Sequence, residues 1–574
     1  MRSGSLIFYR KKFRLNSVIA TFLLGLISIG LGLILWSLNR GFDMSDEAWA
    51  YSLIKSGRDT VNEPWGFHWL LKPIFDLFGH SVLAFRFLRL SIYFILGLIL
   101  YFVLLRSLNS KGMNSKANSL ILFSATQIGT IVSFSYAPPY ISYNELSGWF
   151  VQLIGIVLIS MKPEIKKDRY KWGLVGVLLG FLSVSKISAL FLVVALVLIL
   201  LLTKIRSFLQ AFILGLVGFA TSISFIWLFN FPLKSYLSNN LKLFFDKELQ
   251  IAYAHPIQGM IKKYLIDLIF FVPRHPIIFI IFILISLAFL FSKKSNKTLL
   301  SFFTSVAIFL TLLLSISDMR WNSIGTFIFF FLIVNLALEF IKFFERSGDQ
   351  DGHVFKTGCL VFATITPLVA SFGTSNPIMG QMLFASTLLF GIFSYNLILN
   401  IDRISVFPIL FVAIWSLFIL SIAIFVSPYG NVNLARSVSG ISSGDLRGIS
   451  VDPGRKYRIE IYLDLNKYVK GLDFFTIDNP GALFLSSNDD FANPWINYTT
   501  WPASFLSVSH SCKRDNLLKI GIYTKVGAEN DRLLLLPLNR ALDYCSLTFP
   551  DDFYVKKIYE FDELTEKEQL WVSR

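Results

Sequence analysis

Three carboxylates stand close together just after the first long apolar stretch of the chain. Asp43, Asp46 and Glu47 cannot remain ionised in hydrocarbon without a large cost, so they must face water or other protein groups. A carboxylate at a membrane surface can act as a general base by accepting a proton from an attacking hydroxyl group. We therefore take Asp46 as the candidate base, with Glu47 as its helper or orienter.

The same acids also suit a purely structural role. Ser45 is a candidate N-cap residue, and Asp46 and Glu47 would then lie in the first helical turn, where the helix dipole favours negative charge. Between residues 46 and 56 the apolar residues recur at helical spacing, which predicts an amphipathic helix along the membrane interface. These residues alone do not separate the structural role from the chemical one.

The elements that must position these acids are membrane-spanning helices. The chain of 574 residues is 54% hydrophobic with a mean hydropathy of +0.61, and its apolar runs have the roughly 17–25 residues that a bilayer requires. We predict thirteen helices, near residues 17–38, 81–106, 118–136, 146–161, 172–185, 187–203, 208–230, 275–292, 298–316, 323–342, 356–373, 379–399 and 404–427. The pair 172–185 and 187–203 is short for two crossings and could instead form one kinked or re-entrant unit. No cleavage site follows the first run, which we expect to be a retained helix.

The charge distribution sets the expected orientation. Residues 428–574 hold 17 basic and 19 acidic residues, so the formal charge of +16 comes from the apolar part, residues 1–427. Its basic residues cluster between alternate apolar runs, the positive-inside pattern, which predicts a multi-pass protein with a cytoplasmic N-terminus. An odd number of helices then places residues 428–574 outside the cytoplasm; in a bacterium the membrane would be the inner one. Basic residues placed in this way argue against a nucleic-acid partner.

Residues 428–574 are expected to form a small soluble α/β domain. Strands are predicted near 458–463, 518–524 and 532–536, and helices near 463–471 and 564–571. Cys512 and Cys545 could form a disulfide if the domain faces an oxidising compartment, or could remain two separate buried thiols.

An ordered set of motifs accompanies the acids. The outer loop 39–80 contains Asp46-Glu47, then the Pro- and aromatic-rich stretch 64–69, then Phe78-Gly79 followed by Arg86. A glycine-rich segment that begins at Gly173 ends in Lys186. In this order the motifs resemble the GT-C superfamily of membrane glycosyltransferases, which includes protein O-mannosyltransferases and the aminoarabinose transferases of lipid A. The resemblance covers residues 17–205 best, and it implies a GT-C-like catalytic module over residues 1–427.

The resemblance implies an inverting transfer of a sugar from a polyprenyl-phosphate donor to a glycan, lipid or protein acceptor on the extracytoplasmic side. The leaving lipid phosphate would gain charge as its bond breaks, and fixed cations would stabilise it in a water-poor site. The candidate cations are Arg86, Arg89, Lys186 and Arg320. An arginine could bind phosphate through two hydrogen bonds, whereas Lys186 would act as a point charge. Each could instead be an interfacial residue whose head only reaches water.

One position departs from the pattern of the superfamily. Many members carry an acid in the second outer loop just before helix four, where this chain has Asn144 followed by Glu145. Either Glu145 takes that role or the second acid is missing, which leaves dependence on a divalent cation open. We expect Asn144 and Glu145, together with His68, Trp69 and Tyr143, to contact substrate; the aromatic residues could instead belong to an interfacial belt among membrane lipids.

Two other function classes fit a chain of this kind. An envelope-polysaccharide polymerase or ligase has about as many helices, but its large outer loop lies late in the chain and is rich in arginine. A transporter or flippase should carry polar residues within its helices and broken helices in paired halves. The early acidic loop, the mostly apolar spans and the terminal soluble part favour the glycosyltransferase.

Overall fold

The computed structural model describes a large part of the chain. The described residues are 2–43, 46–56, 66–113, 115–135, 139–161, 166–203, 208–229, 231–245, 257–269, 325, 328–329, 331–339, 350–373, 378–399, 407–426, 433–442, 444–457, 459–460, 473–476, 532–537, 553–561 and 566–573.

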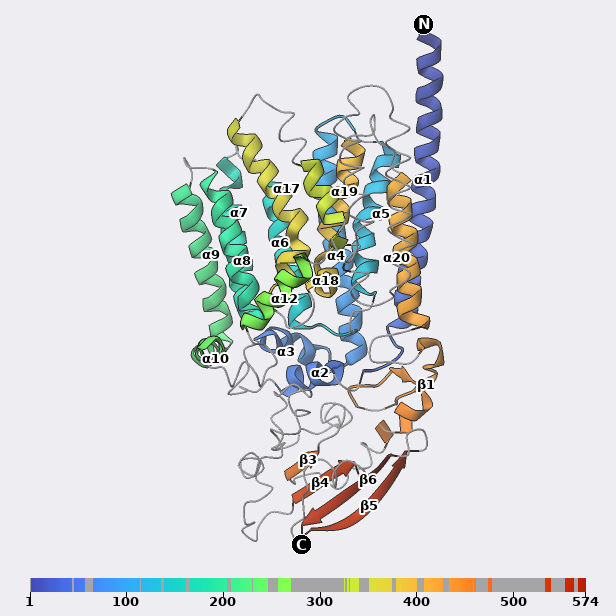
Figure 1. The fold of residues 1–574 in the computed structure, drawn as a ribbon, viewed down its shortest axis with the longest axis vertical. Helices are drawn as coiled ribbons and strands as arrows, with labels where there is room; N and C mark the ends of the chain where they lie inside the picture. The colour runs from blue at the N-terminus through green and yellow to red at the C-terminus, as the bar shows by residue number, and fades with distance from the viewer. Residues whose placement is uncertain are drawn as a thin grey trace.

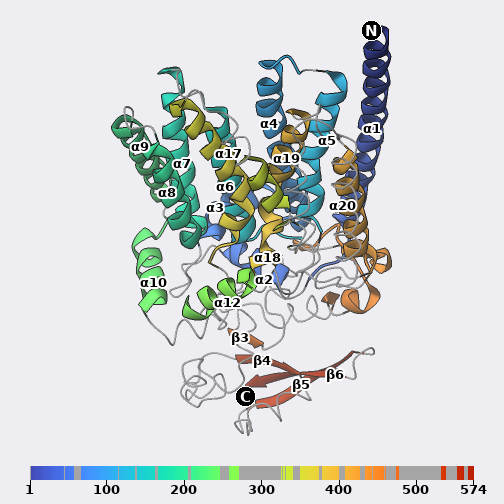
Figure 2. The same ribbon diagram turned by 45° about the horizontal axis from the view of Figure 1, so that its top comes forward.

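The described residues are mostly helical, and the long helices run side by side as one bundle (Figures 1 and 2). The bundle comprises α1 (Arg2–Ser37), α4 (Val82–Asn109), α5 (Lys116–Ser133), α6 (Tyr143–Ser160), α7 (Tyr170–Ser185), α8 (Ile187–Leu202), α9 (Phe208–Leu228), α17 (Gln350–Ser371), α19 (Thr387–Leu399) and α20 (Phe407–Phe425). Four shorter helices lie at the end opposite the N-terminus: α2 (Asp46–Ser56), α3 (Phe67–Leu77), α10 (Leu233–Phe245) and α12 (Ile257–Ile269).

Four described helices are long and apolar enough to cross a membrane: Ser17–Ser37, Val82–Asn109, Phe208–Leu228 and Val354–Ser371. Large apolar side chains such as Phe22, Phe102, Phe191 and Leu209 are exposed on the outside of the bundle. Exposing such an apolar surface to water is unfavourable, whereas the acyl chains of lipids solvate it. The length and apolar surface of these helices indicate membrane association.

The predicted helices that fall on described residues are present. The interfacial helix expected over residues 46–56 is α2, with the same bounds. The helices expected at 275–292 and 298–316 lie outside the described residues, and that at 323–342 is described only in part, with residues 331–339 helical. The total of thirteen crossings therefore stays a prediction.

Helices α7 and α8 form an antiparallel hairpin rather than one kinked rod. The start of α7 and the end of α8 both lie near the start of α17, because Trp172 contacts Phe355 and Leu200 lies against Gly358. The start of α8 lies instead at the end of α17, because the Ser188 hydroxyl donates to the Phe372 carbonyl. A single extended residue, Lys186, separates the two helices.

The glycines of α7 allow close packing against α9. A Cβ atom on Gly176 would lie 1.9 Å from the Gly215 carbonyl oxygen, and one on Gly218 would lie 2.0 Å from that of Gly173. Small residues at a helix contact let two backbones approach and replace the hydrophobic driving force that lipid removes. This packing explains the glycine-rich segment before Lys186.

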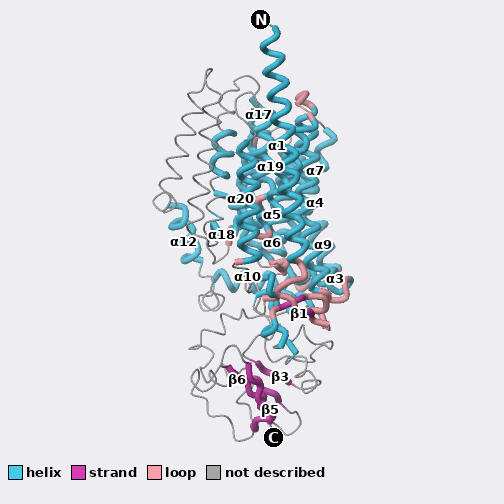
Figure 3. The backbone as a smooth tube through the Cα atoms, turned by 90° about the vertical axis from the view of Figure 1, so that its right-hand side faces the viewer, coloured by secondary structure: helices cyan, strands magenta, loops and turns pink. Residues whose placement is uncertain are grey.

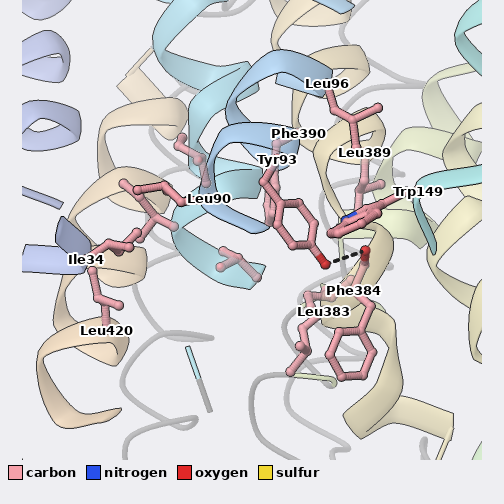
Figure 4. Packing of buried hydrophobic residues seen from close by; sticks show 14 of the residues in the cluster. Ile34, Leu90, Tyr93, Leu96, Trp149, Leu383, Phe384, Leu389, Phe390 and Leu420 are labelled. Carbon is pink, nitrogen blue, oxygen red and sulfur yellow. Dashed lines mark hydrogen bonds between the residues drawn. The ribbon is translucent and has the colours of Figure 1, made fainter. Parts of the chain in front are cut away.

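The helix expected over residues 379–399 is broken. It consists of α18 (Ile378–Gln381), the 3-10 turn η3 (Met382–Ala385) and α19. The break frees backbone groups inside the bundle, where side chains bind them: the Tyr93 hydroxyl donates to the Phe384 carbonyl over 3.3 Å (Figure 4), and Gln152 accepts from the backbone N–H of Thr387 over 3.1 Å. Backbone groups at membrane depth must be satisfied by protein because water is absent there.

The described residues after α20 form two small sheets (Figure 3). Strands β1 (Ser439–Gly440) and β2 (Ser450–Val451) pair antiparallel. Strands β3 (Asp473–Thr476), β4 (Arg532–Pro537), β5 (Phe553–Phe561) and β6 (Glu566–Ser573) form a sheet in the order β3-β4-β6-β5. The pair β3 and β4 is parallel and the other pairs are antiparallel.

Three secondary-structure predictions for this region have different outcomes. The strand at 532–536 is confirmed as β4. The helix predicted over 564–571 is wrong, because these residues pair as β6 with both β4 and β5, and long-range pairing overrides their helical propensity. Residues 459–460 are helical where a strand was predicted. Cys512 and Cys545 lie outside the described residues.

Replacing Gly176 by alanine should destabilise the protein by about 1–3 kcal/mol, because the new methyl group meets the α9 backbone. The thermal unfolding temperature of the detergent-solubilised protein measures this. Gly173→Ala is the matched control, since its Cβ would meet only the Leu214 carbonyl oxygen, at 3.7 Å. Equal unfolding temperatures for the two variants would contradict the packing argument.

Candidate active site

The start of α2 is capped by Asp43. Its buried carboxylate oxygen Oδ2 accepts hydrogen bonds from the backbone N–H groups of Asp46 (3.0 Å) and Glu47 (3.3 Å). These groups have no partner within the helix, so the cap stabilises its first turn. Ser45, the expected N-cap residue, lies outside the described residues. Asp43 thus caps the helix, and the predicted placement of Asp46 and Glu47 in its first turn is confirmed.

Glu47 forms a fully buried ion pair with Arg86 of α4. The Arg86 Nε atom donates to Glu47 Oε1 and Nη2 donates to Oε2, each over 2.8 Å. The remaining N–H groups of Arg86 donate to the carbonyls of Leu38 (2.8 Å), Gly41 (2.9 Å) and Arg40 (3.4 Å). All five N–H donors of a guanidinium group are therefore used within the protein.

The resemblance predicts that Arg86 binds the donor phosphate. In the structure its partners are instead Glu47 and backbone carbonyls. The residue ties the end of α1 to the start of α2. Burial raises the pKa of Glu47 above its ordinary value, while the charge and hydrogen bonds of Arg86 act in the opposite direction. Glu47 Oε2 also accepts from the backbone N–H of Asp43 over 3.1 Å. Both members of the pair therefore hold the loop in place.

A second buried ion pair lies one turn further along α4. The Arg89 Nε atom donates to Glu145 Oε1 over 2.6 Å, and Nη2 donates to the Ser133 carbonyl over 3.0 Å. The guanidinium group also stacks 4.1 Å from the centroid of the Phe134 ring. Arg89, predicted to bind phosphate, and Glu145, predicted to contact substrate, are thus each other's partners and join α4 to the ends of α5 and α6.

Other predicted residues meet around Tyr143, the first residue of α6. Burial raises the pKa of the Tyr143 hydroxyl, a hydrogen bond with Asn144 lowers it, and the nearby Asp46 carboxylate has a smaller raising effect. The Lys186 Nζ atom lies 5.9 Å from the centroid of the Tyr143 ring and donates to Asn144 Oδ1 over 2.9 Å. Lys186 is only 4% exposed. We name Asp46, Tyr143, Asn144 and Lys186 the Tyr143 cluster.

The cluster is assembled from helix ends. Asp46 begins α2, Tyr143 begins α6, and Lys186 is the single residue between α7 and α8. The end of α17 supplies a further contact, because Lys186 Nζ donates to the Ala370 carbonyl over 2.8 Å. These ends lie on the side of the bundle that also carries α3 and α12 (Figures 1 and 2).

The aromatic residues of α3 surround this region without all entering the cluster. Phe67 approaches Tyr143, with ring centroids 6.1 Å apart. His68 is buried beside Phe67 and Trp69. Trp69 packs edge-on against Phe231, which lies between α9 and α10. The structure thus places His68 and Trp69 in the aromatic layer next to the cluster.

The sequence did not single out Tyr264, a buried residue of α12. It lies in the neighbourhood of Tyr143 and packs against Phe372, with ring centroids 5.6 Å apart. The signal available in the sequence was its place in an amphipathic helix of the third outer segment. Arg320, the remaining predicted cation, lies outside the described residues.

Within the described part of the chain, no group of three or more His, Cys, Asp or Glu side chains is arranged to hold a metal ion. Comparison with models of known protein families and with curated protein sequences finds no match to this chain.

Replacing Glu47 by glutamine should destabilise the protein by about 3–5 kcal/mol, because Arg86 would keep its buried charge without a counter-ion. Thermal unfolding in detergent measures the loss. The control Asp76→Asn removes a half-exposed carboxylate that pairs with Lys72, and should cost less than about 1 kcal/mol. If Glu47→Gln unfolds like the parent protein, the pair does not hold the loop.

Proposed function

We propose that this protein is an integral-membrane glycosyltransferase that moves a sugar from a polyprenyl-phosphate donor to a hydroxyl acceptor at the extracytoplasmic surface. The observation that carries the proposal is that Asp46 and Lys186, far apart in the sequence, both lie in the neighbourhood of Tyr143. A carboxylate and an ammonium group are thereby found on the same side of an apolar bundle.

These two groups suit the two halves of the reaction. Asp46 accepts the proton of the acceptor hydroxyl as its oxygen attacks the anomeric carbon. The bond between that carbon and the phosphate oxygen breaks on the opposite face, and the polyprenyl phosphate leaves with the bonding electrons. Burial lowers the pKa of Lys186 to about 7, so a donor phosphate bound beside it would favour the charged ammonium form, which then stabilises the phosphate charge as it develops.

The other predicted residues support this pair. Glu47 and Arg86 fix the loop from which Asp46 projects, and Asn144 holds the Lys186 ammonium group. Arg86 and Arg89 are already engaged by carboxylates and carbonyls, so Lys186 becomes the first choice for the donor phosphate. The role of Glu47 is positioning, in agreement with its place as helper of Asp46.

A lipid flippase or transporter is the second candidate function, and one observation favours it. The break at η3 leaves backbone carbonyls inside the bundle, a feature of transport sites built from discontinuous helices. Side chains of α4 and α6 bind the Phe384 carbonyl, however, which suits a structural joint. The acid and the cation of the Tyr143 cluster favour the transferase.

Asp46→Asn should lower the rate of sugar transfer by about 10²–10⁴-fold, because the acceptor proton would lose its base. Release of polyprenyl phosphate from a panel of synthetic sugar donors, incubated with the purified protein and envelope extract, measures the reaction. Asp76→Asn is the control for loss of one carboxylate. An Asp46→Asn variant with full activity would remove Asp46 from catalysis, and lipid movement without donor cleavage by the parent protein would favour the flippase.

Lys186→Gln should lower kcat/KM for the donor by about 10²–10³-fold, since the leaving phosphate would lose a fixed positive charge. The same donor-cleavage assay measures it, with Lys171→Gln as control because Lys171 pairs with Asp168 near the start of α7, at the other end of that helix. Unchanged donor kinetics in Lys186→Gln would place phosphate binding elsewhere.

A further inference from the structure

Two short helices outside the Tyr143 cluster carry the same surface pattern. On α10, Leu237, Leu241 and Phe245 are exposed, the last of them to 84%. On α12, Ile261, Leu265 and Ile269 are exposed, the last to 64%. Both sets follow the spacing i, i+4, i+8, so each forms one continuous apolar stripe along its helix.

Exposed lysines accompany both stripes. Lys234 and Lys242 stand on α10, which has no acidic residue, and Lys262 and Lys263 stand on α12, which also contains Asp267. An apolar stripe bordered by lysines on a short helix is the pattern of a helix that lies in a membrane interface. The lysines near such a surface attract the phosphates of anionic lipids.

The chain itself places α10 at that interface. The candidate span Phe208–Leu228 ends with Trp227 and Leu228 exposed, followed by exposed Phe229, and α10 begins at Leu233. Only a few residues separate the end of a bilayer-length helix from α10. Its apolar stripe is therefore continuous along the chain with the lipid-facing surface of α9, and the aromatic residues at the junction suit the headgroup level.

The two faces of α12 differ in their surroundings. One face bears the apolar stripe, while Tyr264 on another face is only 5% exposed and packs against Phe372 beside the Tyr143 cluster. A lipid held by the stripe would thus lie on the helix that supplies Tyr264 to the neighbourhood of the cluster.

We propose that α10 and α12 bind anionic phospholipids of the bilayer surface, with Lys234, Lys242 and Lys262 contacting lipid phosphates and the two stripes inserted among acyl chains. Membrane association is the only premise, so the binding holds whether or not the protein transfers sugar. It would concentrate lipid phosphates beside the α12 side of the Tyr143 cluster.

The test uses the full chain in lipid nanodiscs made from phosphatidylcholine with phosphatidylglycerol. Leu241→Cys and Leu265→Cys, in a background with the three native cysteines replaced by serine, carry an environment-sensitive fluorophore. Arg447→Cys, an exposed position beyond the bundle, is the reference. Quenching is compared for phosphatidylglycerol and phosphatidylcholine that carry a nitroxide on the acyl chain, and for iodide in the water.

At positions 241 and 265, nitroxide-labelled phosphatidylglycerol should quench about threefold more than phosphatidylcholine at equal mole fraction, and iodide should quench weakly. The preference should disappear in K234Q/K242Q/K262Q. The control K111Q/K116Q/K356Q removes the same charge from exposed lysines near the opposite end of the bundle and should keep the preference. High salt should also remove the preference for phosphatidylglycerol in the parent protein. This measurement tests the lysines even if the triple variant does not fold.

Three results would overturn the proposal. Equal quenching by the two lipids would show insertion without anionic binding. Strong iodide quenching without lipid quenching would place the stripes in water. Protection from iodide and from both lipids would show that protein, such as a second copy of the chain, covers them.

Discussion

The turn from α1 into α2 depends on the buried pair of Glu47 and Arg86. Removing two charges from water is costly, and the cost is offset only where geometry is good and every remaining donor is satisfied. Arg86 meets this condition, because its N–H groups reach the Glu47 carboxylate and three carbonyls at the end of α1. A long side chain from α4 thus determines where the start of α2 stands. The same pair engages Glu47, which leaves Asp46 as the neighbouring acid that we propose as the base.

The chain after the last bundle helix braces the same turn from the other side. Gly41 donates to the Ser450 carbonyl over 2.8 Å, and Ser450 donates to the Asn39 carbonyl over 2.6 Å. Lys55 of α2 pairs with Asp445 at 2.8 Å, with both side chains largely buried. The segment that carries the candidate base is therefore held between the first helices and a region roughly four hundred residues later. Such bracing restricts the motion of Asp46, as a catalytic group at a membrane surface requires.

Polar groups inside the bundle follow one rule. Lipid offers no hydrogen bonds, so each backbone break needs a side-chain partner. Tyr93 and Gln152 serve the break at η3, and the Asn144 amide oxygen and the Ala370 carbonyl serve the buried Lys186. The apolar cluster around Tyr93, Trp149 and Phe390 surrounds the contact between Tyr93 and Phe384 (Figure 4). These polar partners thus serve places where helices of the bundle break or end.

The sequence by itself determined the elements, because local periodicity and apolar length are properties of neighbouring residues. The bounds of α2 and the membrane-length helices followed from them, and so did the short connection at Lys186. Tertiary structure decided the partners. Whether Arg86 meets a phosphate or Glu47 depends on where its long side chain ends, which spacing along the chain does not encode. The strand β6 was mistaken for a helix because its pairing with β4 comes from distant residues. The approach of Lys186 to Tyr143 and Asn144 is likewise a product of packing, since only the folded bundle brings these helix ends together.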